Sequence, residues 1–323
     1  MSAVVVVGSF NIDHVWHCEA LPGPGATIAG RYSTGPGGKG FNQAIASARA
    51  GASTAFVCAL GDDPGGVQAR SLAAEAGIDL RVQRSDEPTG SAGIYVDGRG
   101  RNSIVIGAGA NADLSVQFLD SQASLLGAAK IVVAQLESPP ACVLAALRHA
   151  RDAGACTLLN PAPANAPTTT ELLQLADIIT PNESEFVAML ARHVGERMDA
   201  DDVSSCDGAR LHALCRELMR EGSVVVTLGA AGVFVSHPDE SSHDAGKSHY
   251  RLAAESVSPV DTTGAGDAFN GALAASWALH PDDAFAEHVR FANRYAALST
   301  EHPGAALGMP STEEVAARFS GTG

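Results

Sequence analysis

The stretch "DTTGAGDAFNGA", residues 261–272, joins a glycine-spaced turn to the start of a helical pattern. Gly264, Ala265 and Gly266 place small residues where the backbone must turn tightly. Asp267 then opens an amphipathic helix, whose first-turn N–H groups have no acceptors within the helix. Such N–H groups and the positive end of a helix together bind anions such as phosphate. The stretch therefore predicts an anion site at the start of this helix.

Asp267 needs a separate explanation, because a carboxylate repels the phosphate that this turn would hold. One interpretation is that Asp267 is an N-cap or first-turn carboxylate that stabilises the helix. The other is that Asp267 takes a proton from a hydroxyl group that attacks the phosphate. The stretch on its own favours the capping interpretation, so the rest of the chain has to decide between the two.

Short runs rich in Val, Ile and Leu alternate with helical periodicity along most of the chain, which is typical of βαβ units. The runs are apolar on both alternations, as expected of strands that are covered on both faces. They are "AVVVVGS" (3–9), "TAFVCALG" (54–61), "KIVVAQLES" (130–138), "CTLLNPAPA" (156–164), "ADIITPNE" (176–183) and "SVVVTLGAAGVFVSH" (223–237). Helices are predicted at 41–50, 66–76, 140–153, 208–221, 267–280, 282–300 and 311–319. The pattern predicts an α/β fold with a doubly wound, mostly parallel sheet flanked by helices.

Two stretches break this rhythm. Residues 10–40 carry several Gly and Pro, and "TGSAGIYVDGRGRNSIVI" (89–106) has the alternation of two strands. The sequence Asp97-Gly98-Arg99-Gly100 between those strands is a hairpin signal. We expect residues 1–323 to form one α/β domain, with a small β-sheet lid built from segments at about 10–40 and 88–107.

The composition argues against several partners. With 36 acidic and 21 basic residues among 323, the formal net charge is −15, which disfavours binding to nucleic acid or to an anionic membrane. The N-terminal apolar run at residues 4–7 is too short for a signal sequence or a membrane span. The six cysteines have no C-x-x-C pair and no zinc-ligand spacing, so we expect them to be reduced and mostly buried. We therefore expect a cytoplasmic protein.

A second glycine cluster, "GPGGKGFNQA" at 35–44, contains the pattern G-x-G-x-x-G. It does not directly follow the first strand, and no acidic residue follows a second strand as a dinucleotide site requires. It is not a P-loop either, because Gly40 stands where that motif has Ser or Thr. Two interpretations remain open: a turn that caps the next helix, or bare backbone at Gly37 and Gly38 that binds a small polar ligand with Lys39 and Asn42.

Polar residues follow several of the predicted strands. Asn11 and Asp13 come directly after the first strand, and Glu137 occupies the equivalent position after "VVAQL". Asn182 and Glu185 follow "ADIIT" in the pattern N-x-x-E. Open α/β sheets bind ligands at the carboxyl ends of their strands. One such residue is usually a helix cap, but five of them together indicate a cleft.

These segments carry a resemblance to a known family. The sequence resembles the ribokinase-like (PfkB) carbohydrate kinases from "VVVVGSFNIDH" (4–14) to "GAALGMP" (304–310), which is nearly the whole chain. Two segments are similar to the two family signatures, "GGKGFNQAIASARAGASTAFVCALGDD" (37–63) and "DTTGAGDAFNGAL" (261–273). Further similarities follow in the right order at "LESP" (136–139), "LNPAPA" (159–164), "ITPNESE" (179–185) and "VTLGAAGVF" (226–234).

The resemblance implies a reaction and a role for each matching residue. It implies phosphate transfer from ATP to the primary hydroxyl of a small sugar, with D-ribose to D-ribose 5-phosphate as the favoured reaction. Asp267 matches the catalytic base, beside an anion hole formed by the amides of Gly264, Ala265 and Gly266. The sugar would be held by the residues that match Asn11, Asp13, Gly38, Lys39, Asn42 and Glu137, together with Asp267. The nucleotide would be held by those that match Asn182, Glu185, Thr227, Gly229 and Gly232.

The resemblance also implies cofactors and an assembly. Mg²⁺ would be organised near the phosphates by Asn182 and Glu185, with Glu185 acting through water. A monovalent cation, K⁺, would bind a loop that Asp261 and Thr263 match in part, with further carbonyl ligands from residues 299–304. The small β layer corresponds to the family's lid, which also forms a homodimer contact.

Alternatives to a ribose kinase stay open. Fructose, a nucleoside or 2-keto-3-deoxygluconate are other acceptors within the family. Phe10 is a candidate platform for a nucleoside base, and Arg99 and Arg101 are candidates for binding a sugar acid, although arginines on a hairpin are expected to face solvent. The alternative from another class is a non-catalytic sugar-binding protein. Asp267 and the intact glycine turn oppose it, because a binding protein needs no base.

The sequence departs from the family pattern in three places. The turn "GAAG" (229–232) lacks a polar side chain, which leaves phosphate contacts there to the backbone. The segment "STEHPGAALGMP" (299–310) has one residue more than the pattern, and the insert at 237–249 has no family counterpart. We expect this insert and residues 192–207 to be surface loops. Their histidines at 237, 243 and 249 are expected to be solvated rather than metal ligands.

Overall fold

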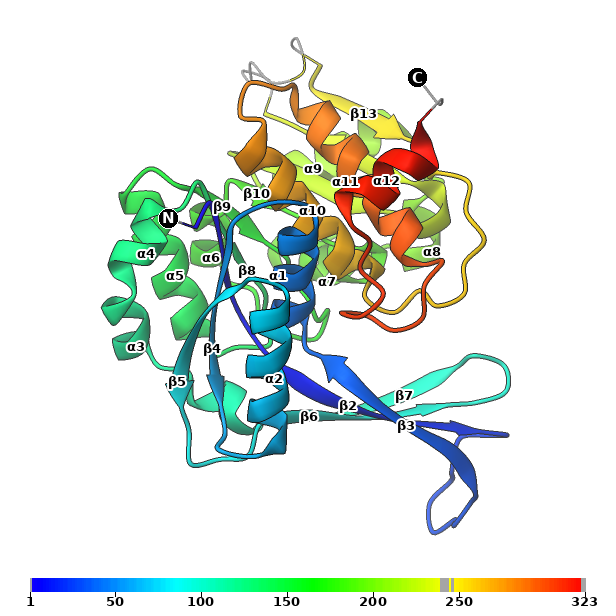
Figure 1. The fold of residues 1–323 in the computed structure, drawn as a ribbon. Coiled ribbons are helices and arrows are strands. Elements are labelled where there is room, and N and C mark those ends of the chain that lie inside the picture. Colours follow the sequence, from blue (N-terminus) through cyan, green and yellow to red (C-terminus); the bar gives the residue numbers. More distant parts are fainter. Residues whose placement is uncertain (1, 239–243, 245–246, 321–323) are drawn as a thin grey trace.

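The computed structural model describes residues 2–238, 244 and 247–320, and its main feature is a nine-stranded sheet with the order β13-β12-β11-β10-β9-β8-β1-β4-β5 (Figure 1). Neighbouring strands from β11 to β5 are parallel, whereas β12 runs antiparallel to both β11 and β13. The strands are β1 (Val4–Val7), β4 (Thr54–Leu60), β5 (Asp79–Arg84), β8 (Ile131–Ala134), β9 (Cys156–Leu159), β10 (Ile178–Ile179), β11 (Ser223–Thr227), β12 (Val233–Ser236) and β13 (His249–Leu252). The predicted mostly parallel α/β fold is confirmed.

Helices cover both faces of this sheet, because its central strands are apolar on both sides. In β1, Val4 and Val6 belong to one core cluster, and Val5 and Val7 belong to another on the opposite face. The helices are α1 (Lys39–Arg49), α2 (Pro64–Glu75), α3 (Val116–Ser121), α4 (Ala123–Ala128), α5 (Pro140–Asp152), α6 (Thr170–Leu175), α7 (Glu183–His193), α8 (Ala200–Val203), α9 (Gly208–Leu218), α10 (Ala265–Leu279), α11 (Phe285–Ser299) and α12 (Thr312–Phe319). The doubly wound arrangement follows from this alternation.

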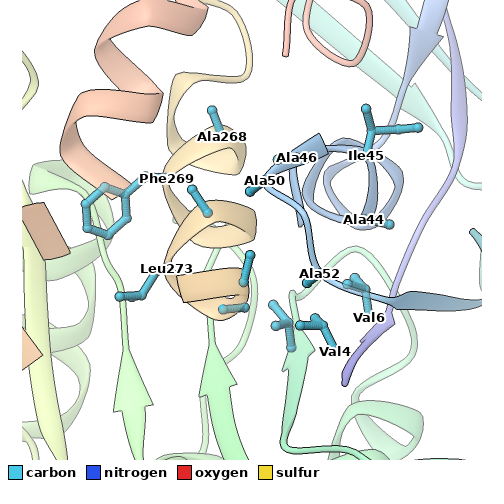
Figure 2. Close-up of a cluster of buried hydrophobic side chains, with 14 of the residues drawn as sticks. Val4, Val6, Ala44, Ile45, Ala46, Ala50, Ala52, Ala268, Phe269 and Leu273 are labelled. Carbon is cyan, nitrogen blue, oxygen red and sulfur yellow. The ribbon is translucent and has the colours of Figure 1, made fainter. Parts of the chain in front are cut away.

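Helices α1 and α10 pack tightly against each other over the centre of the sheet. Figure 2 shows small side chains of α1 beside Ala268, Phe269 and Leu273 of α10, above Val4 and Val6. A Cβ atom at Gly271 would lie 2.4 Å from the Gln43 carbonyl oxygen. Only glycine permits this approach, which brings the N-terminal turns of the two helices together at the carboxyl end of β1.

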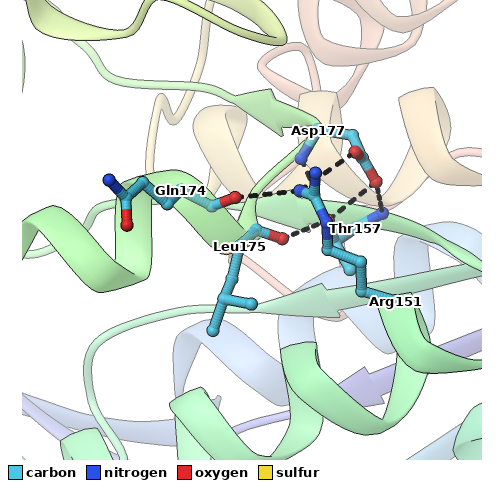
Figure 3. A network of polar contacts seen from close by, with 5 residues as sticks. All are labelled: Arg151, Thr157, Gln174, Leu175 and Asp177. Atoms are coloured by element: carbon cyan, nitrogen blue, oxygen red, sulfur yellow. Dashed lines mark hydrogen bonds and ion pairs between the residues drawn. The ribbon is translucent and has the colours of Figure 1, made fainter.

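A polar network lies at the opposite ends of the strands, where β9 and β10 begin (Figure 3). The Asp177 carboxylate accepts hydrogen bonds from the Thr157 N–H and hydroxyl, each at 2.9 Å, and from Arg151. The single hydroxyl hydrogen of Thr157 is shared between that carboxylate and the Leu175 carbonyl oxygen, which lies 2.6 Å from the hydroxyl oxygen. This network joins α5, α6 and the amino-terminal ends of the two strands. Asn160 and Thr180 follow the opposite, carboxyl-terminal ends of these strands.

A second, four-stranded sheet projects from the main body, in the order β3-β2-β6-β7 (Figure 1). Its strands are β2 (Asn11–Cys18), β3 (Gly30–Gly37), β6 (Gly90–Val96) and β7 (Asn102–Gly107). The β6–β7 turn is closed by the Asp97 carboxylate, which accepts from the N–H groups of Arg99 and Arg101. The predicted hairpin and the small β layer are therefore confirmed.

Other local expectations were wrong. The run 223–237 forms two antiparallel strands, β11 and β12, because Gly229–Ala231 makes a 3₁₀ turn in its middle. The insert at 192–207 contains the short helix α8, and α10 begins at Ala265, two residues before the predicted start. His237 is fully buried rather than solvated, between the Ser223 hydroxyl and the Asp244 carboxylate. His249 stacks on His212, and His243 lies outside the described residues.

Several expectations about surface and composition can be compared with the structure. All six cysteines are free, and four of them are buried. Among the described residues, no helix has both the length and the apolarity needed to span a membrane. In the same part of the chain, no group of three or more His, Cys, Asp or Glu side chains is arranged to hold a metal ion.

Candidate active site

The carboxyl ends of the central strands meet the N-termini of α1 and α10, and the polar residues predicted from the sequence gather there. Asn11 and Asp13 enter from β2, directly after β1, and Glu137 follows β8. The Glu137 carboxylate accepts from the backbone N–H of Lys39 at 3.1 Å. Asp267 enters from the first turn of α10. Segments more than two hundred residues apart in the sequence thus build one site.

Asp267 is held by distant side chains rather than by its own helix. Its carboxylate accepts from Asn42 Nδ2 at Oδ2 and from Gln43 Nε2 at Oδ1, each at 2.9 Å. The side chain is buried, with 7% of the residue exposed. The N-cap of α10 is Gly264, which makes no side-chain cap. Asp267 is therefore not the N-cap of α10, although it lies in the first turn of that helix, and its two oxygens are directed to α1.

The turn before Asp267 depends on glycine. Gly264 has φ of 77°, in the left-handed region, and a Cβ atom there would lie 2.8 Å from the Ala305 Cβ. The Ala265 N–H donates to the Thr262 carbonyl oxygen at 3.2 Å. Of the three amides predicted to face an anion, the loop thus engages that of Ala265, whereas Gly266 lies in the first turn of the helix.

Three carboxylates, those of Asp267, Glu137 and Glu185, act on the Lys39 ammonium group in this site. Burial raises the pKa of Asp267 above its usual range, although the Lys39 ammonium and two side-chain amides oppose the rise. Burial, together with Glu137 and Asp267, raises the pKa of Asp13 to about 7. Burial lowers the pKa of Lys39, but the nearby carboxylates outweigh it and raise that pKa above its usual value. The carboxyl groups of Asp13 and Asp267 therefore have pKa values raised above their usual range, as active-site carboxylates often do, whereas the Lys39 ammonium is held in its charged form.

The predicted sugar-binding residues are fixed from behind by side chains that sequence reasoning missed. Asn111 Nδ2 lies 2.8 Å from the Asn11 side-chain oxygen, and the Ser9 hydroxyl lies 2.5 Å from Glu137 Oε2. Asn42 is 5% exposed, and its Oδ1 has no hydrogen-bond partner among the described residues. Ser9 lies within "GSFNID", so its position next to Asn11 and Asp13 could have indicated a role in the site. Asn111 lies in none of the motifs, so no local pattern indicates its role. Asn42 Oδ1 is an acceptor that a ligand hydroxyl would satisfy.

Asn182 and Glu185 form a capping box at the start of α7. The Asn182 N–H donates to Glu185 Oε2, and the Glu185 N–H donates to Asn182 Oδ1, each at 2.9 Å. The simpler interpretation of such residues as helix caps therefore holds for these contacts. Burial raises the pKa of Glu185, which the Asn182 N–H and the Lys39 ammonium oppose. The electrostatic contacts of Glu185 with Lys39 and Asp267 place it beside the same cluster.

The predicted nucleotide-binding turn lies next to α7. Thr227 ends β11, and its N–H donates to the Pro181 carbonyl oxygen at 3.0 Å. Gly229 begins the 3₁₀ turn that leads into β12, Gly232 follows its last residue, and both have positive φ. The structure therefore brings Thr227 beside the segment that carries Asn182, at the same edge of the sheet as Asp267.

The predicted cation loop joins two segments. Asp261 Oδ1 accepts from the Thr263 N–H, and Oδ2 accepts from the Gly304 N–H, each at 2.9 Å. The Asp261 N–H donates to the Thr300 carbonyl oxygen at 3.0 Å. Burial raises the pKa of Asp261, but the hydrogen bonds from Thr263 and Gly304 outweigh it and lower that pKa. The loop at 261–263 and the predicted carbonyl segment at 299–304 are therefore neighbours.

The alternatives for other acceptors fare differently. Phe10 is fully buried and packs edge-on against Phe41, with ring centroids 4.9 Å apart. It cannot offer a face to a nucleoside base, so that candidate role was wrong. Arg99 and Arg101 are exposed on the hairpin, as expected, and Arg101 pairs with Asp97.

Comparisons with known proteins identify the family of the chain. The model of the pfkB family carbohydrate kinases matches residues 1–312. Ribokinase of Haemophilus influenzae is 37% identical over 314 residues, which cover 96% of each chain. The structure of ribokinase from Giardia lamblia has a TM-score of 0.86 at 29% identity, covering 100% of this chain and 99% of that one. Arabidopsis thaliana ribokinase complexed with ribose and ATP has a TM-score of 0.81 at 30% identity, covering 97% of each chain. The chain belongs to the pfkB family of carbohydrate kinases.

Proposed function

We propose that the protein transfers phosphate from ATP to the primary hydroxyl of D-ribose and so forms D-ribose 5-phosphate. The observation that carries this proposal is the buried Asp267 carboxylate, held by Asn42 and Gln43 at the N-terminal turn of a helix. A base and an anion site at one helix end are what phosphate transfer to a hydroxyl requires. The similar ribokinases named above support ribose as the acceptor.

Asp267 orients the sugar hydroxyl and takes its proton as the oxygen attacks the phosphate. Its raised pKa suits this role, because a general base works best when its pKa lies near the working pH. The first-turn N–H groups of α10 stabilise negative charge on the transferring group. Asn11, Asp13, Gly38, Lys39, Asn42 and Glu137 hold the other hydroxyls, with Asn42 Oδ1 as one acceptor that awaits a donor.

Mg²⁺ fits the donor set beside the base. Glu185 uses Oε2 for the helix cap, so its second carboxylate oxygen is left to bind a metal-bound water. We assign Asn182 and Glu185 to the ion and the phosphates, and Thr227, Gly229 and Gly232 to the nucleotide. When bound, Mg²⁺ would neutralise charge on the phosphate oxygens.

A monovalent cation, K⁺, is assigned to the loop that contains Asp261 and Thr263. The support is that segment 299–304 lies beside this loop, since the Asp261 N–H donates to the Thr300 carbonyl oxygen and the Gly304 N–H donates to the Asp261 carboxylate. The test is the rate of ADP release in K⁺ and in a bulky organic cation at equal ionic strength. A higher rate in K⁺ is expected, and equal rates would remove this assignment.

We assign the small sheet to two roles, a lid over the sugar and a homodimer contact. Asp13 and Trp16 lie on opposite faces of β2, because side chains alternate along a strand. The Asp13 face belongs to the site. The other face carries Trp16 packed against Tyr32 and Tyr95, with Tyr32 50% exposed and Val105 of the neighbouring strand 66% exposed. A second copy that covers this face would remove a large apolar patch from water.

Sedimentation tests the dimer directly. The wild type is expected to be a dimer at micromolar concentration, and Val105→Glu is expected to be a monomer with unchanged far-UV circular dichroism. A wild type that sediments as a monomer would contradict the dimer contact. We also place the protein in the cytoplasm, because its free, mostly buried cysteines suit a reducing compartment.

The experiment that tests the function is ADP release from Mg-ATP in K⁺ buffer with ribose, deoxyribose, fructose, adenosine and 2-keto-3-deoxygluconate in turn. A clear preference for ribose in kcat/KM is expected. A preference for another acceptor would keep the chemistry of Asp267 and overturn the substrate. No ADP release with any acceptor would favour the non-catalytic sugar-binding alternative.

A further inference from the structure

Gln43 and Asn160 stand in two of the motifs described above, "GGKGFNQA" and "LNPAPA", and neither has a role in the proposed reaction. In the structure they form a buried chain of side-chain amides behind Asp267. Gln43 Nε2 lies 2.9 Å from Asp267 Oδ1 and 3.1 Å from Asn160 Oδ1. Asn160 Nδ2 in turn donates to the Thr180 carbonyl oxygen at 3.0 Å. Gln43 and Asn160 are 0% and 6% exposed.

The direction of this chain is set by its two ends. The Thr180 carbonyl can only accept a hydrogen bond, so Asn160 must present its NH₂ group there and its oxygen towards Gln43. Gln43 must then present its NH₂ group to Asn160, and its second amide hydrogen is directed to Asp267. Gln135 Nε2 donates to the Gln43 side-chain oxygen at 2.6 Å, which is consistent with the same orientation. The Thr180 backbone carbonyl thus sets the orientation of both amides, so that the Gln43 NH₂ group donates to Asp267 Oδ1.

Thr180 also supports the helix that carries the base. Its hydroxyl lies 2.5 Å from the Asn270 side-chain oxygen, and Asn270 Nδ2 donates to the Gly266 carbonyl oxygen at 2.8 Å. Thr180 and Asn270 are each 1% exposed. One threonine at the end of β10 therefore orients both the amide chain to the Asp267 carboxylate and the first turn of α10.

We propose that Gln43 is a positioning residue for Asp267, with its amide orientation set through Asn160 by the Thr180 carbonyl. This inference rests on the proposed function of Asp267 as the base. A protonated Asp267 Oδ1 would have no acceptor in this chain of amides, because Gln43 presents its NH₂ group, which can only donate, to that oxygen. The Gln43 amide thereby fixes the carboxylate in one orientation and favours its ionised form.

Other charged groups act on Asp267 from each neighbouring element. Lys39 of α1 favours the ionised carboxylate, whereas Glu137 after β8 opposes it. Asp13 of β2 and Glu185 of α7 are negative groups that interact with Asp267 as well. These groups stay in place when Gln43 is replaced. A change in the pH profile on replacing Gln43 therefore reports the lost amide.

The test is Gln43→Met, which keeps the length of the side chain and removes both donors. With the acceptor that the wild type phosphorylates best, kcat is expected to fall about 10- to 100-fold, because small displacements of a catalytic group cost this much. The acid limb of the kcat profile is expected to move to higher pH. The Kd for the sugar, measured by calorimetry without ATP, is expected to change by less than about threefold, since Gln43 is not assigned to the sugar.

Thr157→Val is the matched control. Thr157 is a buried polar residue of β9, the strand that ends just before Asn160. Its partners Leu175 and Asp177 lie at the other end of that strand (Figure 3). It is expected to lower Tm to a similar extent, with kcat and its pH profile unchanged. If Thr157→Val reproduced the kinetic changes of Gln43→Met, general destabilisation would explain both and the inference would fall.

Asn160→Leu provides a second variant in case Gln43→Met does not fold. It removes the acceptor for Gln43 without touching Asp267, so the same changes are expected at a smaller size. Wild-type kcat and pH profile in the folded variant would overturn the inference while an inactive Asp267→Asn still upheld the proposed function. A wild type without turnover on any acceptor would remove the proposed function itself, and this inference with it.

Discussion

The N-termini of α7 and α10 each carry an acidic residue at the third position of the helix, and the two residues are used differently. Glu185 of α7 exchanges hydrogen bonds with its own N-cap, Asn182, which is only three positions away. Asp267 of α10 has a glycine N-cap, and its carboxylate accepts from Asn42 and Gln43, which are 225 and 224 positions away. The same helical position thus supports a local cap in one place and a tertiary contact in the other.

This difference separates stability from chemistry. A carboxylate that caps its own helix is explained by the hydrogen bonds it makes there. The Asp267 carboxylate is buried, interacts with three other acids and gives its helix no cap, and burial raises its pKa. Glu185 is intermediate, because it caps α7 and also interacts with Lys39 and Asp267. Predictions that separate the two roles follow from this comparison.

The largest effect expected at the α7 box concerns Mg²⁺ dependence. Glu185→Gln keeps the capping box, since glutamine serves there as well as glutamate, but removes the charge proposed to hold a metal-bound water. We expect kcat/KM for ATP to fall about 10- to 100-fold and the Mg²⁺ concentration needed for half-maximal rate to rise.

Glu314→Gln is the control for that experiment. Glu314 occupies the same position in the exposed capping box of α12, with Ser311 as the N-cap. It is expected to leave the Mg²⁺ dependence unchanged and to shift Tm by a similarly small amount. An equal loss of activity in both variants would show that Glu185 acts through helix stability alone.

A smaller effect is expected in the pH dependence of sugar binding, through Asp13, a carboxylate that caps no helix. Because the pKa of Asp13 is raised to about 7, its ionised fraction falls about tenfold between pH 8 and pH 6. If the ionised form accepts the sugar hydroxyls, the Kd for ribose should rise about tenfold over this range. Calorimetric titration without ATP measures it. The curve for Asp13→Asn should be flat, and a wild-type Kd that does not depend on pH would remove Asp13 from sugar binding.

The smallest effect is the energy of the cap itself. Asn182→Ala removes the acceptor for the Glu185 N–H, and we expect it to lower the free energy of unfolding by about 1 kcal/mol. Asn182→Gly should cost only a few tenths of that amount, because glycine is tolerated at N-caps. Urea denaturation monitored by circular dichroism gives both values. Identical stability of wild type and Asn182→Ala would mean that the box does not stabilise α7.

Local patterns predicted much of this molecule. The apolar run of β1 and the hairpin around Asp97 each depend on neighbours in the sequence, and the structure contains both. The N-x-x-E pattern, interpreted as part of a cleft, also forms a local helix cap at Asn182. The apolar run at 223–237 forms two antiparallel strands, because the turn at Gly229–Ala231, which only the family resemblance indicated, lies inside it. Periodicity alone does not reveal where such a run reverses.

The partners of Asp267 were beyond local patterns. Asn42 is predicted to bind a ligand because it stands beside the bare backbone of Gly37 and Gly38, whereas no local pattern indicates a role for Gln43. Both reach Asp267 because Gly271 lets α10 approach α1 closely enough for the two amides to reach separate carboxylate oxygens. Phe10 was predicted as a platform for a nucleoside base, which was wrong. Its burial against Phe41 depends on the packing of α1 over the sheet, which the local sequence does not reveal.

The most direct test of Asp267 as the base is the turnover of Asp267→Asn with saturating ribose and Mg-ATP, measured beside ribose binding by calorimetry. General-base catalysis contributes about 10²- to 10⁴-fold, so we predict a loss of kcat of at least this size with ribose still bound. Turnover close to that of the wild type would contradict the account and return Asp267 to a structural role.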